Sequence, residues 1–369
     1  MHKRLLLVST SSTRGGAEKI LYTLAKNLSR EKFDITGFIS LKSLGAYGDL
    51  LKKEGIEVES FETDRRGFFP AVSTLRSVLA DKRPDIILAF MYQAVQLCRF
   101  VKISSPVSFK LVSSHRVNPR TRSFFTLLMD RALKSQDNLT VAECEASRSF
   151  LVQDQGYPPK QVKVIYNGIG TAEHNWTQEE KIAFRRKLKI KENSFLIGTA
   201  GRLHKQKNHA VLIDAVSLLQ AQTNVQCIIF GEGPERGALE TQIKTLGLEG
   251  KVILAGEKEN ASSFFPALDA FILSSNWEGF PSVILEAMEA KTPVIATAVD
   301  GVPEIIQEGF NGFLVPPQNP KALANAISRL IDFPEDSRAV LLENARQSVL
   351  NRFSLTEMIK SYENIFLEA

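Results

Sequence analysis

The 369-residue sequence contains only three cysteines, Cys98, Cys144 and Cys227, which are odd in number and far apart. This spacing excludes a disulfide framework and the paired cysteines of a structural zinc site. The sequence also lacks any apolar run close to the roughly 20 residues that a membrane-spanning helix needs. The apolar run at residues 5–8 is shorter than the ~7–15 residues of a signal-peptide core. We therefore expect a cytoplasmic protein whose first strand is buried.

Neither the apolar nor the charged content is extreme. Hydrophobic residues make up 44% of the chain and charged residues 24%, which is typical of a soluble globular protein and not of a disordered one. The chain is too long for one compact core and favours two domains.

Basic residues are concentrated in the first half of the chain. Residues 1–168 contain 26 Lys and Arg against 16 Asp and Glu, whereas the remainder contains 20 against 25. Within the excess, "HRVNPRTRSFF" interleaves basic and aromatic side chains, and we assign Arg116, Arg120 and Arg122 to a face for the acceptor or an anionic membrane. A solvated basic surface is the alternative. Nucleic acid is not expected, because no recognition motif accompanies the charge.

Strand-sized apolar runs alternate with helical patterns along the chain. "RLLLVS" precedes "AEKILYTLAKNLSR", in which apolar residues recur at helical spacing. After a polar stretch that suits a linker, "SFLIGTAGRL" restarts the alternation. This βαβ pattern predicts parallel sheets with helices on both faces. We expect an α/β protein of two doubly wound, Rossmann-like domains with a cleft between them.

Three strand-end loops are candidates for a site, because open parallel sheets bind ligands at the carboxyl ends of their strands. In the first, Gly15 and Gly16 precede a helix N-terminus, which favours anions. In the second, Arg202 and Lys207 combine a guanidinium fork with a compact ammonium, which suits a diphosphate. In the third, Gly231 lets the backbone approach a nucleoside. Plain glycine turns and a solvated basic pair are the alternatives.

A fourth loop, "WEGFPSVILEAMEA", places Glu278 and Glu286 on either side of a helix start. Pro281 lies near the first helical position, and the unpaired N–H groups of residues 281–283 are expected to form an anion site made of backbone. Glu286 lies in the helix among apolar residues, where a carboxylate needs a partner. The pattern suggests one carboxylate for a transferred group, amides for phosphates and a second carboxylate for vicinal hydroxyls.

"EGFPSVILE" resembles the E-x7-E signature of retaining glycosyltransferases of family 4, which have the two-domain GT-B fold. Further segments occur in the family's order along nearly the whole chain, namely "GGAEK", "VIYNGI", "GRLHKQKN", "FGEGPE" and "GVPEII…GFNGFLVPP". The resemblance implies an acceptor domain at residues 1–167, a donor domain at 168–351, and a final helix at about 352–369 that returns to the first domain. Gly170 departs from the acidic residue common in relatives, which weakens the inference about the linker only.

The resemblance also implies roles for individual residues. Arg202 and Lys207 would hold the donor diphosphate and stabilise it as it leaves. Glu286 would bind the ribose hydroxyls and Glu278 the donor sugar, while His115 would lie near the reacting centre. The alternative is that His115, a histidine at the end of a strand, has only a structural role. Further donor contacts are expected from Gly15, Gly16, Gly231, Gly279, Phe280, Pro281, Ser282 and Val283.

The expected activity is that of a retaining hexosyltransferase (EC 2.4) that needs no metal and no cofactor. Its expected partners are a nucleotide diphosphate-sugar, with UDP favoured by the family, and a hydroxyl of a lipid-linked or cell-surface glycan. Such an acceptor implies peripheral contact with the inner face of an anionic membrane. No Asp-x-Asp cluster is present for a divalent metal, so basic side chains and helix amides must offset the leaving diphosphate. A nucleotide-sugar epimerase or hydrolase of the same fold, or a transferase with a soluble acceptor, is the alternative.

Overall fold

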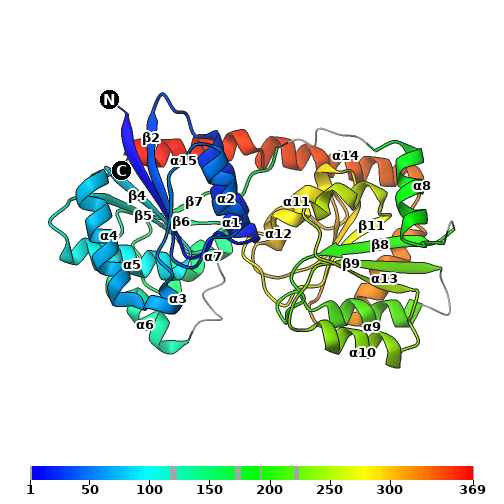
Figure 1. Ribbon diagram of the computed structural model, residues 1–369. Coiled ribbons are helices and arrows are strands. Elements are labelled where there is room, and N and C mark those ends of the chain that lie inside the picture. Colours follow the sequence, from blue (N-terminus) through cyan, green and yellow to red (C-terminus); the bar gives the residue numbers. More distant parts are fainter. Residues whose placement is uncertain (1, 117–122, 171–175, 192, 220–223, 369) are drawn as a thin grey trace. The chain divides into compact units, whose positions relative to one another are not determined.

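The computed structural model describes residues 2–116, 123–170, 176–191, 193–219 and 224–368. The chain divides into two compact units, Met1–Asn167 with Leu355–Ala369, and Gly168–Ser354 (Figure 1). Each unit contains a parallel sheet packed against helices, which confirms the expected α/β fold with two Rossmann-like domains. The returning C-terminal helix begins at Leu355, slightly later than expected.

The first unit has a seven-stranded sheet in the order β3-β2-β1-β4-β5-β6-β7, and all neighbouring strands are parallel. In β1, Leu5 and Leu7 join one apolar core, whereas Leu6 and Val8 join another. Both faces of the sheet are therefore covered, which explains why its central strands are almost continuously apolar. The strands are β1 (Lys3–Ser9), β2 (Phe33–Ser40), β3 (Val58–Ser60), β4 (Ile86–Phe90), β5 (Lys110–Ser114), β6 (Leu139–Ala142) and β7 (Val162–Val164).

The C-terminal helix α15 (Leu355–Glu368) is part of the first unit. Tyr362 and Phe366 are buried in one of its cores, the Phe366 ring packs edge-on against Phe33, and Glu363 pairs with Lys32 at 2.8 Å. The other helices of this unit are α1 (Gly16–Asn27), α2 (Ala46–Lys53), α3 (Thr63–Arg66), α4 (Phe68–Lys82), α5 (Tyr92–Ser104), α6 (Phe124–Leu133), η2 (Lys134–Gln136), α7 (Glu145–Ser149) and η3 (Phe150–Asp154).

The second unit has a six-stranded parallel sheet in the order β10-β9-β8-β11-β12-β13. Its strands are β8 (Phe195–Ala200), β9 (Val225–Phe230), β10 (Val252–Gly256), β11 (Ala270–Leu273), β12 (Val294–Thr297) and β13 (Phe313–Val315). Its helices are α8 (Gln178–Lys187), α9 (His209–Leu219), α10 (Arg236–Thr245), η4 (Ala261–Ala267), α11 (Ser282–Glu289), α12 (Val302–Ile305), α13 (Pro320–Ile331) and α14 (Glu335–Arg352). Local signals set some boundaries: Asn319 caps α13 and Pro320 occupies its first turn.

Strand order reverses between β1 and β4 in the first sheet, and between β8 and β11 in the second. In open α/β sheets the loops after the strands at such a reversal form the ligand site. Residues 201–208 follow β8 and residues 274–281 follow β11; these are called the β8 loop and the β11 loop below.

Among the residues that the structure describes, no helix is both long enough and apolar enough to cross a membrane.

Candidate functional site

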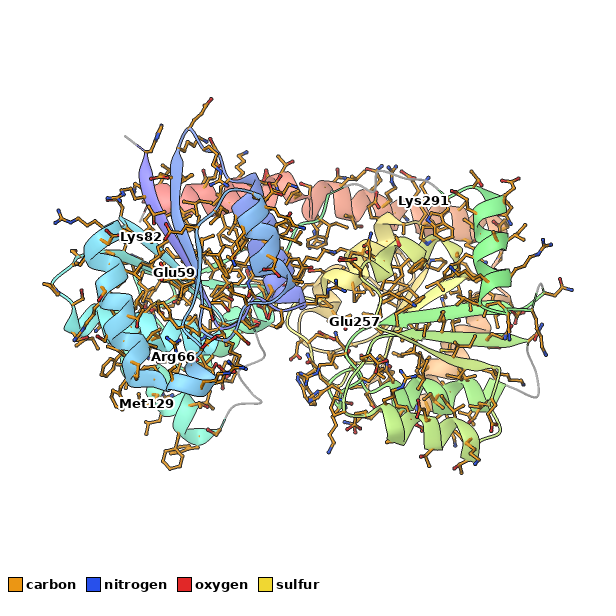
Figure 2. The ribbon with its side chains drawn as sticks, in the orientation of Figure 1. Glu59, Arg66, Lys82, Met129, Glu257 and Lys291 are labelled. Carbon is orange, nitrogen blue, oxygen red and sulfur yellow. The ribbon has the colours of Figure 1, made fainter. Side chains whose placement is uncertain are left out.

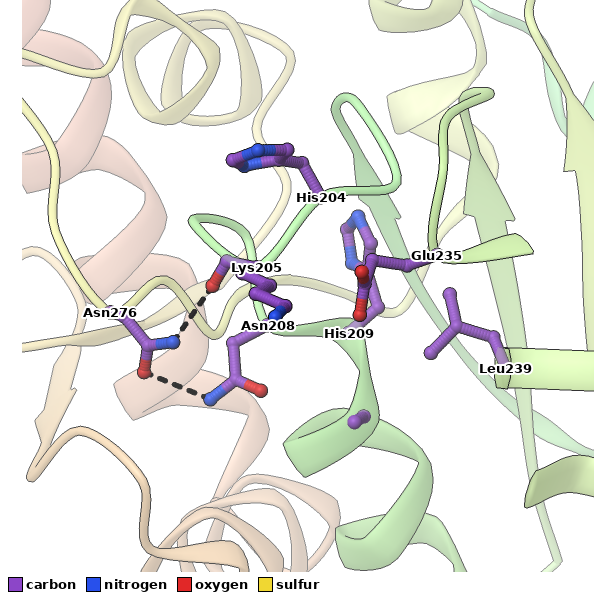
Figure 3. A pocket seen from close by; sticks show the side chains of 8 residues that line it. His204, Lys205, Asn208, His209, Glu235, Leu239 and Asn276 are labelled. Carbon is purple, nitrogen blue, oxygen red and sulfur yellow. Dashed lines mark hydrogen bonds between the residues drawn. The ribbon is translucent and has the colours of Figure 1, made fainter. Parts of the chain in front are cut away.

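Hydrogen bonds join the β8 loop to the β11 loop at the switch point of the second sheet. The backbone amide of Asn276 donates to the Gln206 carbonyl at 2.8 Å. The Asn276 side chain donates to the Lys205 carbonyl at 2.8 Å and accepts from the Asn208 amide at 3.0 Å (Figure 3). Ser274 Oγ also donates to the Asn208 carbonyl at 3.1 Å. The two loops therefore form one connected surface at the carboxyl end of the sheet.

Lys207 and Glu278, which were chosen from separate loops, are in direct contact. Lys207 Nζ lies 2.5 Å from Glu278 Oε1, and the side chains are only 17% and 6% exposed. Ser275 Oγ donates to the same carboxylate oxygen at 2.6 Å, and the Glu278 amide donates to Asp300 Oδ2 at 2.9 Å. These contacts fix the ammonium and the carboxylate in place. Arg202 lies in the same β8 loop and is exposed.

The start of α11 corrects one detail of the expected anion site. Pro281 is the N-cap, outside the helix, and it has no N–H, so the amides at this end belong to Ser282 and Val283. The N-cap residue Pro281 makes no capping hydrogen bond through its own side chain, and helix N-termini favour bound anions. Phe280 is buried against Phe353, with ring centroids 5.3 Å apart. Glu286 lies one turn into the helix and is half-buried.

Gly231 has a structural reason to be glycine. Its φ is +146°, and a Cβ there would overlap the Gly201 carbonyl oxygen in the β8 loop. The Leu203 amide also donates to the Glu232 carbonyl at 2.9 Å. The loop after β9 therefore rests directly on the β8 loop. Gly279 makes a related contact, since its carbonyl accepts from the Gly301 amide at 3.2 Å. Donor contacts of both glycines remain predictions.

His209, at the start of α9, was missed by the sequence reasoning. It is only 3% exposed. Burial, aided by the positive charge of Lys207, lowers the pKa of His209 to about 4, so the ring is neutral near pH 7. The ring borders a cavity of about 180 Å³ (Figure 3). The cavity is lined by His204, Lys205, Asn208, His209, Ala210, Glu235, Leu239 and Asn276.

In the first unit, Gly15 is the N-cap of α1 and Gly16 is its first residue. The Glu18 carboxylate folds back against Gly15, where a Cβ would overlap it, and accepts a hydrogen bond from Ser11 Oγ. Gly16 has open space where a Cβ would stand. The glycine pair thus shapes the start of α1 at the switch point of the first sheet.

His115 follows β5 and is buried. Its Nε2 lies 3.7 Å from Asp130 Oδ1 and 3.4 Å from the Tyr157 hydroxyl. The histidine is therefore anchored from the interior of the first unit, at the carboxyl end of its sheet.

The basic face assigned from the sequence differs in the structure. Arg116 is half-buried, and its guanidinium donates to Ser114, Asn167 and Tyr362 and lies over the Phe90 ring. These contacts hold the guanidinium within the first unit, and the side chain stays partly exposed. Arg120 and Arg122 lie outside the described residues. The charge count could not show this, because it does not separate buried from exposed cations.

Exposed apolar side chains, more than basic ones, mark a candidate contact surface on the first unit. On α6, Phe124 and Phe125 are 75% and 76% exposed, and Leu128 and Met129 are exposed beside them. A second exposed set lies on α4 and α5, which pack together, and consists of Phe68, Phe69, Phe100 and Ile103. Of these exposed side chains, only Phe124 and Phe125 belong to the basic and aromatic stretch "HRVNPRTRSFF".

No group of three or more His, Cys, Asp or Glu side chains that could hold a metal ion occurs among the described residues.

Two family models match this chain: Glycosyltransferase Family 4 over residues 14–173 and Glycosyl transferases group 1 over residues 180–348.

Curated relatives and a solved structure extend the comparison. The uncharacterized glycosyltransferase MJ1607 of Methanocaldococcus jannaschii is 34% identical over 57% of this chain and 54% of its own length. A Campylobacter jejuni GalNAc-alpha-(1->4)-GalNAc-alpha-(1->3)-diNAcBac-PP-undecaprenol alpha-1,4-N-acetyl-D-galactosaminyltransferase is 26% identical over 94% of this chain and 93% of its own. For several curated relatives the matched part is little more than half of their length. Anabaena Alr3699/HepE in complex with UDP-glucose has a TM-score of 0.89 at 27% identity, covering 100% of both chains.

Proposed function

Because the chain belongs to glycosyltransferase family 4, whose members have the GT-B fold, we propose that it transfers a sugar from a nucleotide diphosphate-sugar to a hydroxyl of a glycan acceptor. A UDP-sugar is the proposed donor, since a similar structure is a complex with UDP-glucose. A lipid-linked glycan is the proposed acceptor, since the names of similar proteins include diphospho-undecaprenol glycans. The proposed reaction retains the anomeric configuration and needs no metal ion.

The contact between Lys207 and Glu278 is the observation that carries this proposal. It places a cation and a carboxylate 2.5 Å apart at the strand-order reversal of the second sheet, where open α/β sheets bind ligands. The opposite charges of Lys207 and Glu278 offset each other. A diphosphate that accepts from the ammonium would leave the Glu278 carboxylate available to a sugar hydroxyl.

The chemical difficulty of this reaction is the negative charge that develops on the leaving diphosphate. Arg202 and Lys207 on the β8 loop, together with the amides at the start of α11, are the groups proposed to stabilise it. Charge stabilisation by donors already in place is often the largest catalytic contribution, with one donor worth roughly 10²–10³ in rate. Glu286, one turn into α11, is proposed to accept hydrogen bonds from the ribose hydroxyls.

A donor screen tests the proposal. We expect a UDP-sugar to raise the melting temperature of the wild-type protein more than GDP- or ADP-sugars do, because a ligand that binds only the folded state stabilises it. Glu286→Ala should fold normally and bind the donor about 10–100-fold more weakly, since it loses hydrogen bonds to a charged group worth about 1.5–3 kcal/mol. Glu289→Ala, on the same helix, is the matched control. Transfer should continue with EDTA present.

Three outcomes would contradict the proposal. A donor consumed equally fast without any acceptor would indicate a hydrolase or an epimerase. Product with inverted anomeric configuration, seen by NMR, would remove the retaining mechanism. Unchanged donor affinity in Glu286→Ala would remove the nucleotide site from α11.

We also propose that the exposed apolar side chains of α6, α4 and α5 contact the membrane that carries the acceptor. These helices are neighbours, because α5 packs on both α4 and α6. Exposed Arg65 and Arg66 lie on α3, which packs against α4. Figure 2 shows Arg66 and Met129 in the lower half of the first unit. Aromatic side chains with nearby cations suit the interface of an anionic bilayer.

Vesicle binding tests this surface. Wild-type protein should sediment with vesicles that contain phosphatidylglycerol, and Phe124→Ser/Phe125→Ser should bind at least about tenfold more weakly, because two exposed aromatic rings no longer insert. Phe310→Ser, which removes an exposed ring from the second unit, is the control and should bind like the wild type. Equal binding by all three proteins would refute the membrane surface.

A further inference from the structure

The β11 loop has a second neighbour besides the β8 loop. β11 lies between β8 and β12 in the sheet, and Leu273 at the end of β11 pairs with Ala296 of β12. Residues 298–301 follow β12 and are called the β12 loop below. At the end of β12, Thr297 Oγ1 donates to the Ser275 carbonyl at 2.7 Å, and both side chains are buried. The β11 loop is therefore held from the β12 side as well.

The β12 loop holds two consecutive residues of the β11 loop by their backbone. Asp300 Oδ2 accepts from the Glu278 amide at 2.9 Å, and the Gly301 amide donates to the Gly279 carbonyl at 3.2 Å. Glu278 as a whole is only 5% exposed, so its amide is in a place where a hydrogen-bond partner matters. These two bonds fix the backbone from which the Glu278 side chain extends.

The backbone of Asp300 makes its side chain informative. Its φ is +44°, in the left-handed region that glycine adopts without strain and that other residues adopt less readily. Aspartate and asparagine are the non-glycine residues that tolerate this region best, because their short polar side chains form local hydrogen bonds. Glycine would fit the same backbone, but it would supply no acceptor for the Glu278 amide. The carboxylate is therefore the group that Asp300 adds at this position.

The Glu278 carboxylate has anchors of its own, and one of them changes role in the proposed reaction. Lys207 Nζ and Ser275 Oγ lie 2.5 Å and 2.6 Å from Glu278 Oε1. When Lys207 donates to a bound diphosphate, its hold on Glu278 weakens. The position of the carboxylate then depends more on Ser275 and on the backbone that Asp300 holds.

We propose that Asp300 is a positioning residue for the donor sugar. By holding the Glu278 amide, it keeps the Glu278 carboxylate where a hydroxyl of the sugar can donate to it. Asp300 thereby sets how much the sugar, as distinct from the UDP part, adds to the binding of the donor. The inference rests on the proposed function, in which Glu278 accepts a hydrogen bond from the sugar.

Asp300→Gly tests the inference, because it removes the acceptor and keeps a residue that suits the left-handed backbone. Titration calorimetry would compare UDP with UDP-glucose, UDP-galactose and UDP-N-acetylglucosamine. For the sugar nucleotide that binds wild type most tightly, the affinity should fall about tenfold, as for one lost hydrogen bond to a charged group. The affinity for UDP should stay within about twofold, because UDP carries no sugar for Glu278 to bind. A loss of stability alone would not change the ratio of the two affinities.

Two further variants serve as controls. Asp300→Asn keeps an acceptor and the tolerance for the left-handed backbone, but its neutral bond is about half as strong. We expect its UDP-sugar affinity to fall only about threefold. Gln318→Gly makes the same kind of backbone change at an exposed residue with φ of +58°, after β13 in the same unit. It should bind both UDP and the UDP-sugar like the wild type.

The outcomes separate this inference from the proposed function. An unchanged ratio of UDP-sugar to UDP affinity in Asp300→Gly overturns the inference, and so does an equal loss of both affinities. If Asp300→Gly does not fold, Asp300→Asn decides in the same way. A wild type that binds UDP but gains nothing from any of the three sugars also overturns the inference, while its nucleotide site still supports the proposed function. A wild type that binds none of these ligands contradicts the proposed donor, and the inference falls with it.

Discussion

Lys207→Ala is expected to lower kcat by about 10²–10³-fold, because the variant loses the ammonium proposed to stabilise the leaving diphosphate. It should also destabilise the second unit. Glu278, with a side chain only 6% exposed, would keep Ser275 as a hydrogen-bond donor but lose its cation. Removing one member of a buried ion pair costs about 3–5 kcal/mol, and we expect the lower end because Lys207 is 17% exposed.

A double variant separates the two effects of losing Lys207. Lys207→Ala/Glu278→Gln also removes the stranded carboxylate, so urea unfolding should show that much of the lost stability returns. Initial rates should remain low, because no cation is restored. Lys205→Ala is the control, since its exposed side chain belongs to the same loop and only its backbone carbonyl holds Asn276. Recovery of activity in the double variant would show that Lys207 has a structural role only.

The sequence predicts that Lys207 and Glu278 belong to the site, but it does not predict that they are in contact. Lys207 and Glu278 could be chosen separately, because each follows a strand and the carboxyl ends of parallel strands lie at one edge. They are 71 residues apart, and their contact depends on β8 and β11 being neighbours in the sheet. The βαβ alternation predicts parallel strands but does not give their order.

Burial decides which basic residues are available to a partner, and the sequence does not report burial. Arg99 contributed to the basic excess of the first half, yet it is buried between Asp130 and Asp137. Arg116 similarly binds Asn167 and Tyr362 inside the first unit. The aromatic residues of α6 show the opposite effect. Apolar residues at helical spacing normally indicate a buried helix face, yet these side chains are exposed.

Gly231→Ala is expected to destabilise the second unit by at least about 2 kcal/mol, although it adds only one methyl group. The backbone at Gly231 has φ of +146°, which L side chains rarely adopt, and the added Cβ would overlap the Gly201 carbonyl oxygen. Both groups belong to the backbone of loops that rest on each other, so no flexible side chain can move aside. Relief would require the β8 loop, with Arg202 and Lys207, to shift.

Gly231→Ala should therefore lower both the stability of the second unit and its binding of the donor. We expect a melting temperature lower by about 4–8 °C, since about 2 kcal/mol shifts a unit of this size by that amount, and a smaller stabilisation by UDP-sugar. Gly237→Ala is the matched control, because this α10 glycine has open space where its Cβ would stand. It should be as stable as the wild type or slightly more so, because alanine favours helix. A Gly231→Ala variant as stable as Gly237→Ala would show that the packing of these two loops does not hold the β8 loop in place.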